Sequence, residues 1–210
     1  MYTRILSLLL ILIICSIVQA QDPENIISNG DFEAQFDSWL FWTQDGAVAE
    51  RFIENKKVEP VDGESVAYVK IDNQGAGGTN NQVQFYQGPF VIKKDKKYTV
   101  SAWVMGGKGG EQISISVLKH ADPWTGYGSK AITLGTEWDE YSFTFTQPVD
   151  EPNTRLDFFL GTAKGNIWID HVRLYEGEYF DDGVKKRPGK SVDTQSKLST
   201  TWGKIKGKRV

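Results

Sequence analysis

The sequence of 210 residues is poor in cysteine and histidine, with one cysteine and two histidines. Cys15 lies in an apolar N-terminal run, so a chain without that run has no disulfide, no thiolate metal site and no cysteine nucleophile. His120 and His171 are far apart in the sequence and neither has a metal-ligand spacing, so we interpret both as structural. Stability outside a cell must then come from a packed core, alone or together with a bound ion.

Motifs of the common enzyme classes are also absent. The chain has no GxSxG, no HExxH, no Walker loop and no GxGxxG after a strand. Acidic residues are plentiful, so a pair of carboxylates for the hydrolysis of glycosyl bonds stays open as an alternative, but no pair is singled out by its position. We therefore predict a protein that is not an enzyme.

Residues 21–180 lack the periodicity of amphipathic helices and consist of short segments that alternate between apolar and polar residues. Glycine-rich turns, such as Gly106-Gly107 and Gly109-Gly110, separate these segments. The predicted strands are residues 47–53, 65–71, 82–87, 90–92, 98–105, 112–119, 130–134, 138–146, 155–161 and 167–175. This pattern predicts one all-β domain over residues 21–180, a two-sheet antiparallel β-sandwich of the jelly-roll kind.

The N-terminus has the three parts of a secretory signal peptide. Arg4 supplies the basic start, residues 5–18 are apolar, and small residues end the segment at Ala20. An uncleaved anchor and a lipidated Cys15 are the alternatives, and Ile14 argues against lipidation because that position is normally small. We predict a signal peptide over residues 1–20, and hence a secreted or cell-surface protein with no stable membrane span after cleavage.

The C-terminal residues 181–210 form a basic linker and tail with nine basic and three acidic side chains. Residues 21–180 hold 24 acidic and 14 basic side chains, which disfavours nucleic acid as a partner. In the tail, Leu198, Trp202 and Ile205 have the spacing of a short amphipathic helix. The tail therefore either docks on an envelope or surface partner or is a disordered basic extension.

Polar and aromatic side chains share one face of several predicted strands. Gln82, Gln84 and Tyr86 alternate with apolar residues of their strand. In another strand, Phe159 also lies on the face opposite to the alternating apolar residues. Amides can donate and accept hydrogen bonds, and aromatic rings offer flat apolar surfaces. Sugars need this combination because their hydroxyls form hydrogen bonds while their C–H faces stack on rings. An ordinary solvated outer face is the alternative.

Two segments outside the predicted strands carry large aromatic residues. Trp39, Phe41 and Trp42 follow the N-terminal turn and form either a core plug or an exposed patch. Trp124 and Tyr127 lie among proline and glycine, where exposed rings are available for stacking on a ligand or else cap one end of the sandwich.

The segment GNIWIDHVRL, residues 165–174, has an irregular apolar pattern. Odd positions are apolar before Asp170 and even positions are apolar after it. A half-buried strand keeps one parity, so we expect either cover on both faces or a bulge at Asp170. A carboxylate in such a place is costly unless a cation or donor meets it, whereas a solvated edge position would need no partner.

Seven segments together resemble the carbohydrate-binding modules of families 4, 9 and 22. They are NIISNGDFE (25–33), VDGESVAYVKI (61–71), NQVQFYQ (81–87), YTVSAWVM (98–105), TEWDEYSFTFT (136–146), RLDFFLG (155–161) and GNIWIDHVRL (165–174). The resemblance implies a non-catalytic jelly roll that binds a polysaccharide or oligosaccharide in a cleft across one sheet. Such modules are usually attached to glycoside hydrolases.

The resemblance also implies site residues. The cleft would use Gln82, Gln84, Tyr86, Trp124, Tyr127 and Phe159, while Trp103 is taken as structural. A structural Ca²⁺ would be held by Glu33, Asp62 and Asp170 with the backbone carbonyls of Asp31 and Ser65, since oxygen ligands suit calcium. The sequence departs from the family at Asn81, where a stacking tryptophan is frequent, and at His171, where a second aspartate is usual.

Three functions follow as hypotheses. The first is a secreted carbohydrate-binding module stabilised by calcium. The second is a structural or adhesive cell-surface protein that keeps the fold without binding sugar and is attached through its basic tail. The third is a small glycoside hydrolase.

Overall fold

The computed structural model describes residues 22–185. The predicted signal peptide and residues 186–210 of the predicted tail lie outside the described residues. The described chain is built from strands and one short 3₁₀ helix, η1 (Asn80–Gln82). No helix in this part of the chain is long and apolar enough to cross a membrane.

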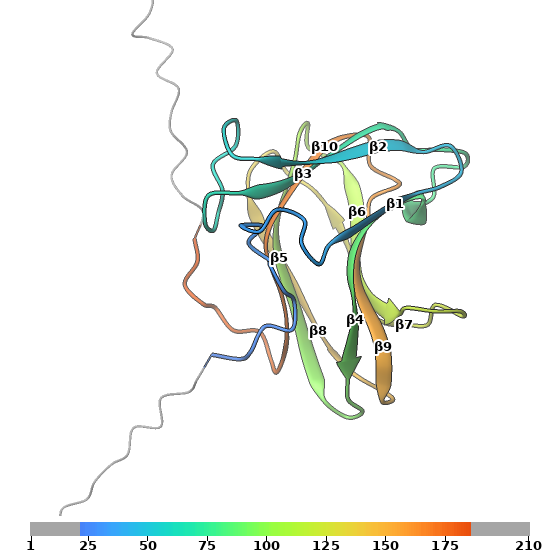
Figure 1. Ribbon diagram of the computed structural model, residues 1–210, viewed down its shortest axis with the longest axis vertical. Helices are drawn as coiled ribbons and strands as arrows, with labels where there is room; N and C mark the ends of the chain where they lie inside the picture. The colour runs from blue at the N-terminus through green and yellow to red at the C-terminus, as the bar shows by residue number, and fades with distance from the viewer. Residues whose placement is uncertain (1–21, 186–210) are drawn as a thin grey trace, which may run out of the picture.

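Two antiparallel five-stranded sheets face each other, as the prediction of a β-sandwich requires (Figure 1). One sheet, called here the β9 sheet, has the order β1 (Leu40–Thr43), β4 (Val83–Ile92), β9 (Glu151–Phe159), β6 (Gln112–Lys119), β7 (Gly126–Thr133). The other, the β10 sheet, has the order β2 (Val48–Glu54), β3 (Val66–Asn73), β10 (Gly165–Glu176), β5 (Lys97–Gly106), β8 (Asp139–Thr146). The all-β sandwich of the jelly-roll kind is thus confirmed.

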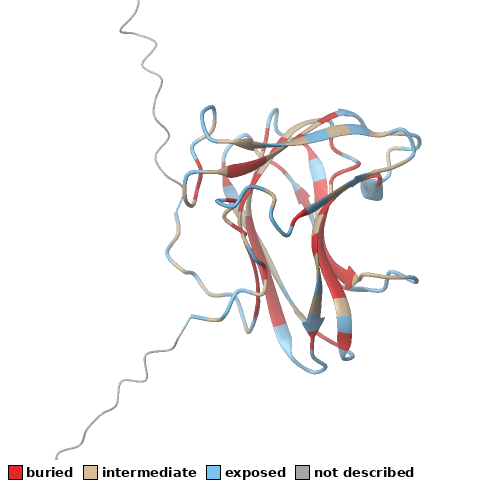
Figure 2. Ribbon diagram, viewed as in Figure 1, coloured by how far each residue is buried: buried red, intermediate tan, exposed pale blue. Residues whose placement is uncertain are grey.

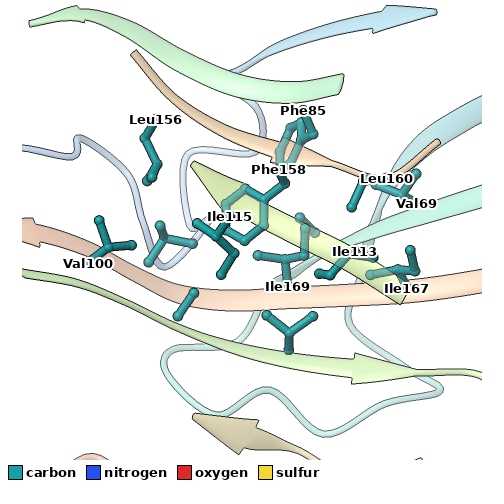
Figure 3. Packing of buried hydrophobic residues seen from close by; sticks show 14 of the residues in the cluster. Val69, Phe85, Val100, Ile113, Ile115, Leu156, Phe158, Leu160, Ile167 and Ile169 are labelled. Carbon is teal, nitrogen blue, oxygen red and sulfur yellow. The ribbon is translucent and has the colours of Figure 1, made fainter. Parts of the chain in front are cut away.

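The core lies between the inner faces of the two sheets. In the β9 sheet, Phe85, Phe158 and Ile115 stand opposite one another on neighbouring strands, and all three side chains are fully buried. The β10 sheet contributes Ile167 and Ile169 from the facing side (Figure 3). Figure 2 shows buried residues along the strands of both sheets and exposed residues at the hairpin ends. The two-residue alternation of each strand therefore leaves a second, outward face free to build a site.

The predicted strands match the observed ones except at four places, the first of which is β9, which begins at Glu151 and not at residue 155. The predicted strands 82–87 and 90–92 are one strand, β4, whose pairing with β9 is irregular between Gln87 and Ile92. Strand β7 begins at Gly126, four residues before the predicted start, because it pairs along the whole of β6. Strand β1 was expected as a loop; its four residues pair with β4 at the sheet edge and are too few to show a period.

Strand β10 contains a bulge, which is one of the two alternatives that the change of apolar parity left open. Its pairing with β5 shifts register between Asp170 and Arg173, and His171 has a φ of 46°. The bulge frees the Val172 N–H, which donates to the Gly30 carbonyl oxygen at 2.9 Å. A side chain at Gly30 would come within 2.1 Å of the Val172 oxygen, so this close approach requires glycine.

The N-terminal segment 22–39 ties the two sheets together. Ile26 donates its N–H to Leu174 of β10, while Ser28 exchanges two hydrogen bonds of 2.8 Å with the side chain of Gln87 in β4. Further along the segment, the Trp39 ring stacks on Phe85 at 4.7 Å between centroids. The segment therefore closes one side of the core and delivers the chain to β1.

Candidate functional site

The outer face of the β9 sheet carries two rows of side chains from neighbouring strands. Gln84 of β4 stands opposite Phe159 of β9, and Tyr86 stands opposite Asp157. These positions alternate with the buried Phe85 and Phe158, so the same period that fills the core fixes the outward row.

A cleft of about 460 Å³ lies over these rows. We name it the Trp124 cleft after the exposed tryptophan that the loop between β6 and β7 contributes to its wall. Its walls are aromatic, amide and basic side chains with one leucine: Trp42, Gln44, Asn81, Gln84, Tyr86, Leu118, His120, Trp124, Arg155 and Phe159. A second hollow of similar size adjoins it and shares Leu118, Trp124 and Phe159.

A buried ion pair forms the base of the cleft. Nη2 of Arg155 lies 2.7 Å from Oδ2 of Asp157, whose side chain is fully buried. Oδ1 of Asp157 has no hydrogen-bond donor among the described residues. Burial raises the pKa of Asp157 to about 8, and the charge of Arg155 offsets only part of this effect.

The guanidinium of Arg155 lies between two aromatic rings. Its central carbon is 4.6 Å from the centroid of Tyr86 and 5.0 Å from that of Trp124. Nη2 also donates to Oε1 of Gln84 at 2.7 Å, and Nε2 of Gln84 donates to the Asn81 carbonyl at the same distance. Arg155 therefore holds the orientation of three cleft side chains at once.

The loop between β6 and β7 holds Trp124 over the sheet. Its first residue, His120, donates its N–H to Asn153 at 2.7 Å and accepts from the Asn153 side chain at 3.2 Å. Trp124 has a φ of 56°, which is costly for a bulky residue and persists only where the surroundings fix it. Half of the Trp124 side chain is exposed, so the indole is available on its solvent side.

Trp42 supplies a second indole on the other side of the cleft. Strand β1 puts Trp42 opposite Gln84, and 55% of Trp42 is exposed. Trp39, three residues earlier, is only 2% exposed. Each of the two readings of this aromatic segment thus holds for one tryptophan, a core plug for Trp39 and an exposed surface for Trp42.

Four of the six residues predicted for the cleft lie in it: Gln84, Tyr86, Trp124 and Phe159. Tyr127 lies in the adjoining hollow, and its hydroxyl donates to Glu151 at 2.9 Å. Gln82 is apart from the cleft because it belongs to η1, not to β4; its buried amide bonds to Thr79 and Ala76 and so holds the loop before the strand.

Arg155 and His120 are among the cleft residues that were not expected from the sequence. Arg155 and Phe159 are an even number of positions apart, which indicates that they lie on the same face of β9. A basic residue at the start of a predicted strand is nevertheless usually solvated. His120 was interpreted as structural, and the structure places it in the cleft wall, edge-on to Tyr86 at 5.5 Å. Burial lowers the pKa of His120, and the charge of Arg155 lowers it further.

The three carboxylates predicted to hold calcium surround the loop 61–65. Oε1 of Glu33 accepts the N–H groups of Glu64 and Ser65 at 2.7 and 2.8 Å. Oδ2 of Asp170 accepts those of Val61 and Asp62, while its Oδ1 accepts that of His171. Burial raises the pKa of Asp170 to about 7 although these donors oppose the shift.

Asp62, the third predicted side-chain ligand, is hydrogen-bonded to a histidine instead. Its Oδ2 lies 2.8 Å from Nδ1 of His171, whose Nε2 lies 2.7 Å from Asp182. Asp31 contributes a side-chain oxygen that accepts the N–H of Glu33 at 3.4 Å. Oxygen donors suit calcium, but in this arrangement the carboxylates already accept hydrogen bonds from protein groups. Among residues 22–185, no three His, Cys, Asp or Glu side chains are grouped so that they could hold a metal ion. Calcium binding stays a prediction.

The described residues form a β-sandwich with a cleft on the outer face of one sheet. Residues 24–165 match the family 4/9 model described as "Carbohydrate binding domain", and the chain belongs to this family. No curated protein matches the chain.

Solved structures of carbohydrate-binding modules share the fold. A module described by the words "CBM4 structure and function" is 24% identical, with a TM-score of 0.58 over 72% of this chain and 99% of that one. A family 61 module in complex with β-1,4-galactotriose is 18% identical, with a TM-score of 0.51 over 73% of this chain and 99% of that one. The family 22 module and xylanase of Clostridium thermocellum Xyn10B, complexed with xylohexaose, is 19% identical, with a TM-score of 0.53 over 71% of this chain and 28% of that one. At these identities the likeness concerns the fold.

The raised pKa of Asp157 predicts how stability depends on pH. The folded protein keeps a proton that the unfolded chain releases from its ordinary pKa of 3.8, so this group makes stability fall as pH rises from about 4 to about 8. Asp157→Asn removes the titration, and we expect a flatter pH dependence of the free energy of urea unfolding than in the wild type. Asp122→Asn, in the loop before Trp124, is the control. An unchanged slope in Asp157→Asn would contradict the assignment.

Proposed function

We propose that this chain is a secreted, non-catalytic module that binds a plant-type or microbial polysaccharide or oligosaccharide in the Trp124 cleft. One observation carries the proposal: two half-exposed indoles, Trp42 and Trp124, flank a hollow whose walls between them carry amide groups. Rings of this kind stack on the C–H faces of a pyranose, and amides bind its hydroxyls. Membership of the carbohydrate-binding family supports the same role.

The cleft is already ordered by contacts within the protein. Gln84 is fixed by Arg155 and by the Asn81 carbonyl, and Tyr86 is fixed by Arg155 and His120. Side chains held in this way lose little conformational entropy when a ligand binds. A cleft of this kind supports binding without a large rearrangement. Secretion rests on the predicted signal peptide and would give a mature chain that begins at Gln21.

The indoles provide the direct test of the cleft. Trp124→Ala and Trp42→Ala should each weaken binding to the polysaccharide that a glycan array selects by about tenfold, which corresponds to about 1.4 kcal/mol, because each loses a stacking surface. Affinity electrophoresis and calorimetry measure the loss. Phe52→Ala is the matched control, since Phe52 is an aromatic residue of β2 with 41% exposure on the other sheet. Equal affinity in all three variants would exclude the cleft.

We also propose calcium binding at the corner of Glu33, Asp62 and Asp170, which would require these carboxylates to turn away from their present N–H donors. A ligand at a hundred times its Kd stabilises the folded state by about 2.7 kcal/mol. The midpoint of thermal unfolding should then be higher in calcium than in chelator, and Glu33→Gln should remove the difference. Identical wild-type midpoints in the two buffers would remove calcium from the account.

A further inference from the structure

The Trp124 cleft has a charge pattern that differs from that of the domain around it. Residues 21–180 hold 24 acidic and 14 basic side chains, yet no carboxylate lines this cleft or the hollow that adjoins it. A third hollow is lined by neutral residues of η1, β6 and β7 together with Thr79 and Thr162. The titratable groups in the wall of the cleft are Arg155, His120 and the phenol of Tyr86. A hollow lined by one sign of charge attracts ligands of the opposite sign.

The ion pair beneath the cleft does not cancel this charge from the ligand's side. Arg155 lines the cleft, whereas Asp157 is fully buried and is not part of the wall. Of the two members of the pair, only Arg155, which is 6% exposed, reaches the wall of the cleft.

The guanidinium is also fixed in its plane. Tyr86 and Trp124 lie within 5.0 Å of its central carbon, and its contacts with Gln84 and Asp157 both use Nη2. A guanidinium carries five N–H donors in a rigid fork that matches a planar carboxylate. A guanidinium that is held in this way is suited to binding one planar anion in a fixed orientation, rather than to attracting anions of any shape.

His120 provides a second nitrogen on the same wall. Its ring is 5.5 Å from Tyr86 and 6.4 Å from Trp124, the two rings that hold Arg155. The charge of Arg155 disfavours protonation of His120, which shows that the two side chains share one electrostatic environment. An anion beside Arg155 would thus meet two nitrogen-bearing side chains.

We propose that the saccharide in the Trp124 cleft is acidic, with a uronate carboxylate against Arg155 and its pyranose ring against the indoles of Trp42 and Trp124. The assignment rests on the proposed function and narrows its substrate class to saccharides that contain uronic acids. A uronate carries its carboxylate on the sugar ring itself, so one residue satisfies the guanidinium and the stacking surface together.

The test compares acidic and neutral probes with the full chain. Calorimetry is run with hexagalacturonate, hexamannuronate, cellohexaose, laminarihexaose and xylohexaose at 50 and 500 mM NaCl. We expect at least one uronate hexasaccharide to bind tenfold or more tightly than every neutral one. We also expect its affinity to fall severalfold at the higher salt, because screening weakens an ionic contact. This comparison needs no variant and is independent of any folding defect.

Variants then locate the charge. Arg155→Gln combined with Asp157→Asn removes both members of the buried pair, so no single charge is left unpaired. We expect the double variant to lose the preference for the uronate and its salt dependence. Lys57→Gln changes the net charge of the protein at a side chain that is 83% exposed, and it should behave as the wild type.

Three results would overturn the inference. Neutral hexasaccharides that bind the wild type as tightly as the uronates would reject an acidic ligand and leave the proposed function intact. A uronate preference that survives in the double variant would reject the role of Arg155. Binding of no saccharide, acidic or neutral, would reject the proposed function and the inference together.

Discussion

The contact between the guanidinium of Arg155 and the carboxylate of Asp157 organises the outer face of the β9 sheet. Two charges removed from water are costly unless they meet each other and further partners. Arg155 meets this requirement with Gln84, Tyr86 and Trp124, which are three of the side chains that line the cleft. The binding face is therefore shaped by the need to compensate a buried charge, and its rings and amides are in place before a ligand arrives.

A second set of contacts, around the bulge in β10, fixes both ends of the domain without a disulfide. The bulge in β10 turns Val172 toward Gly30, and Asp170 accepts three N–H groups from the bulge and the loop 61–65. Arg173 adds ion pairs to Glu140 and Asp182, which attach the C-terminal segment to the β10 sheet. These contacts involve the β10 sheet, whereas the proposed binding cleft lies on the β9 sheet.

Much of the fold could be predicted from the sequence because strands with one buried face alternate with a period of two. The break in that period at Asp170 indicated either a bulge or cover on both faces, and the structure has a bulge there. Strand β1 was not predicted, because four residues at a sheet edge carry too little pattern. The alternation of the strands predicts that Gln84 and Phe159 face outward into the cleft. Arg155 and His120 become cleft residues only because β9 pairs with β4 and because the loop between β6 and β7 is hydrogen-bonded to β9. Such partners depend on the register between strands, which local sequence does not determine.

The central claim is that ligand binds on the outer face of the β9 sheet. The seven tryptophans of the chain provide a direct measurement, because each indole N–H gives its own signal in a ¹H–¹⁵N spectrum. Titration with the saccharide that binds most tightly should shift the indole signals of Trp42 and Trp124 and leave those of Trp103, Trp138 and Trp168, which belong to the β10 sheet or pack against it, in place. Shifts confined to Trp103, Trp138 and Trp168 would contradict the account.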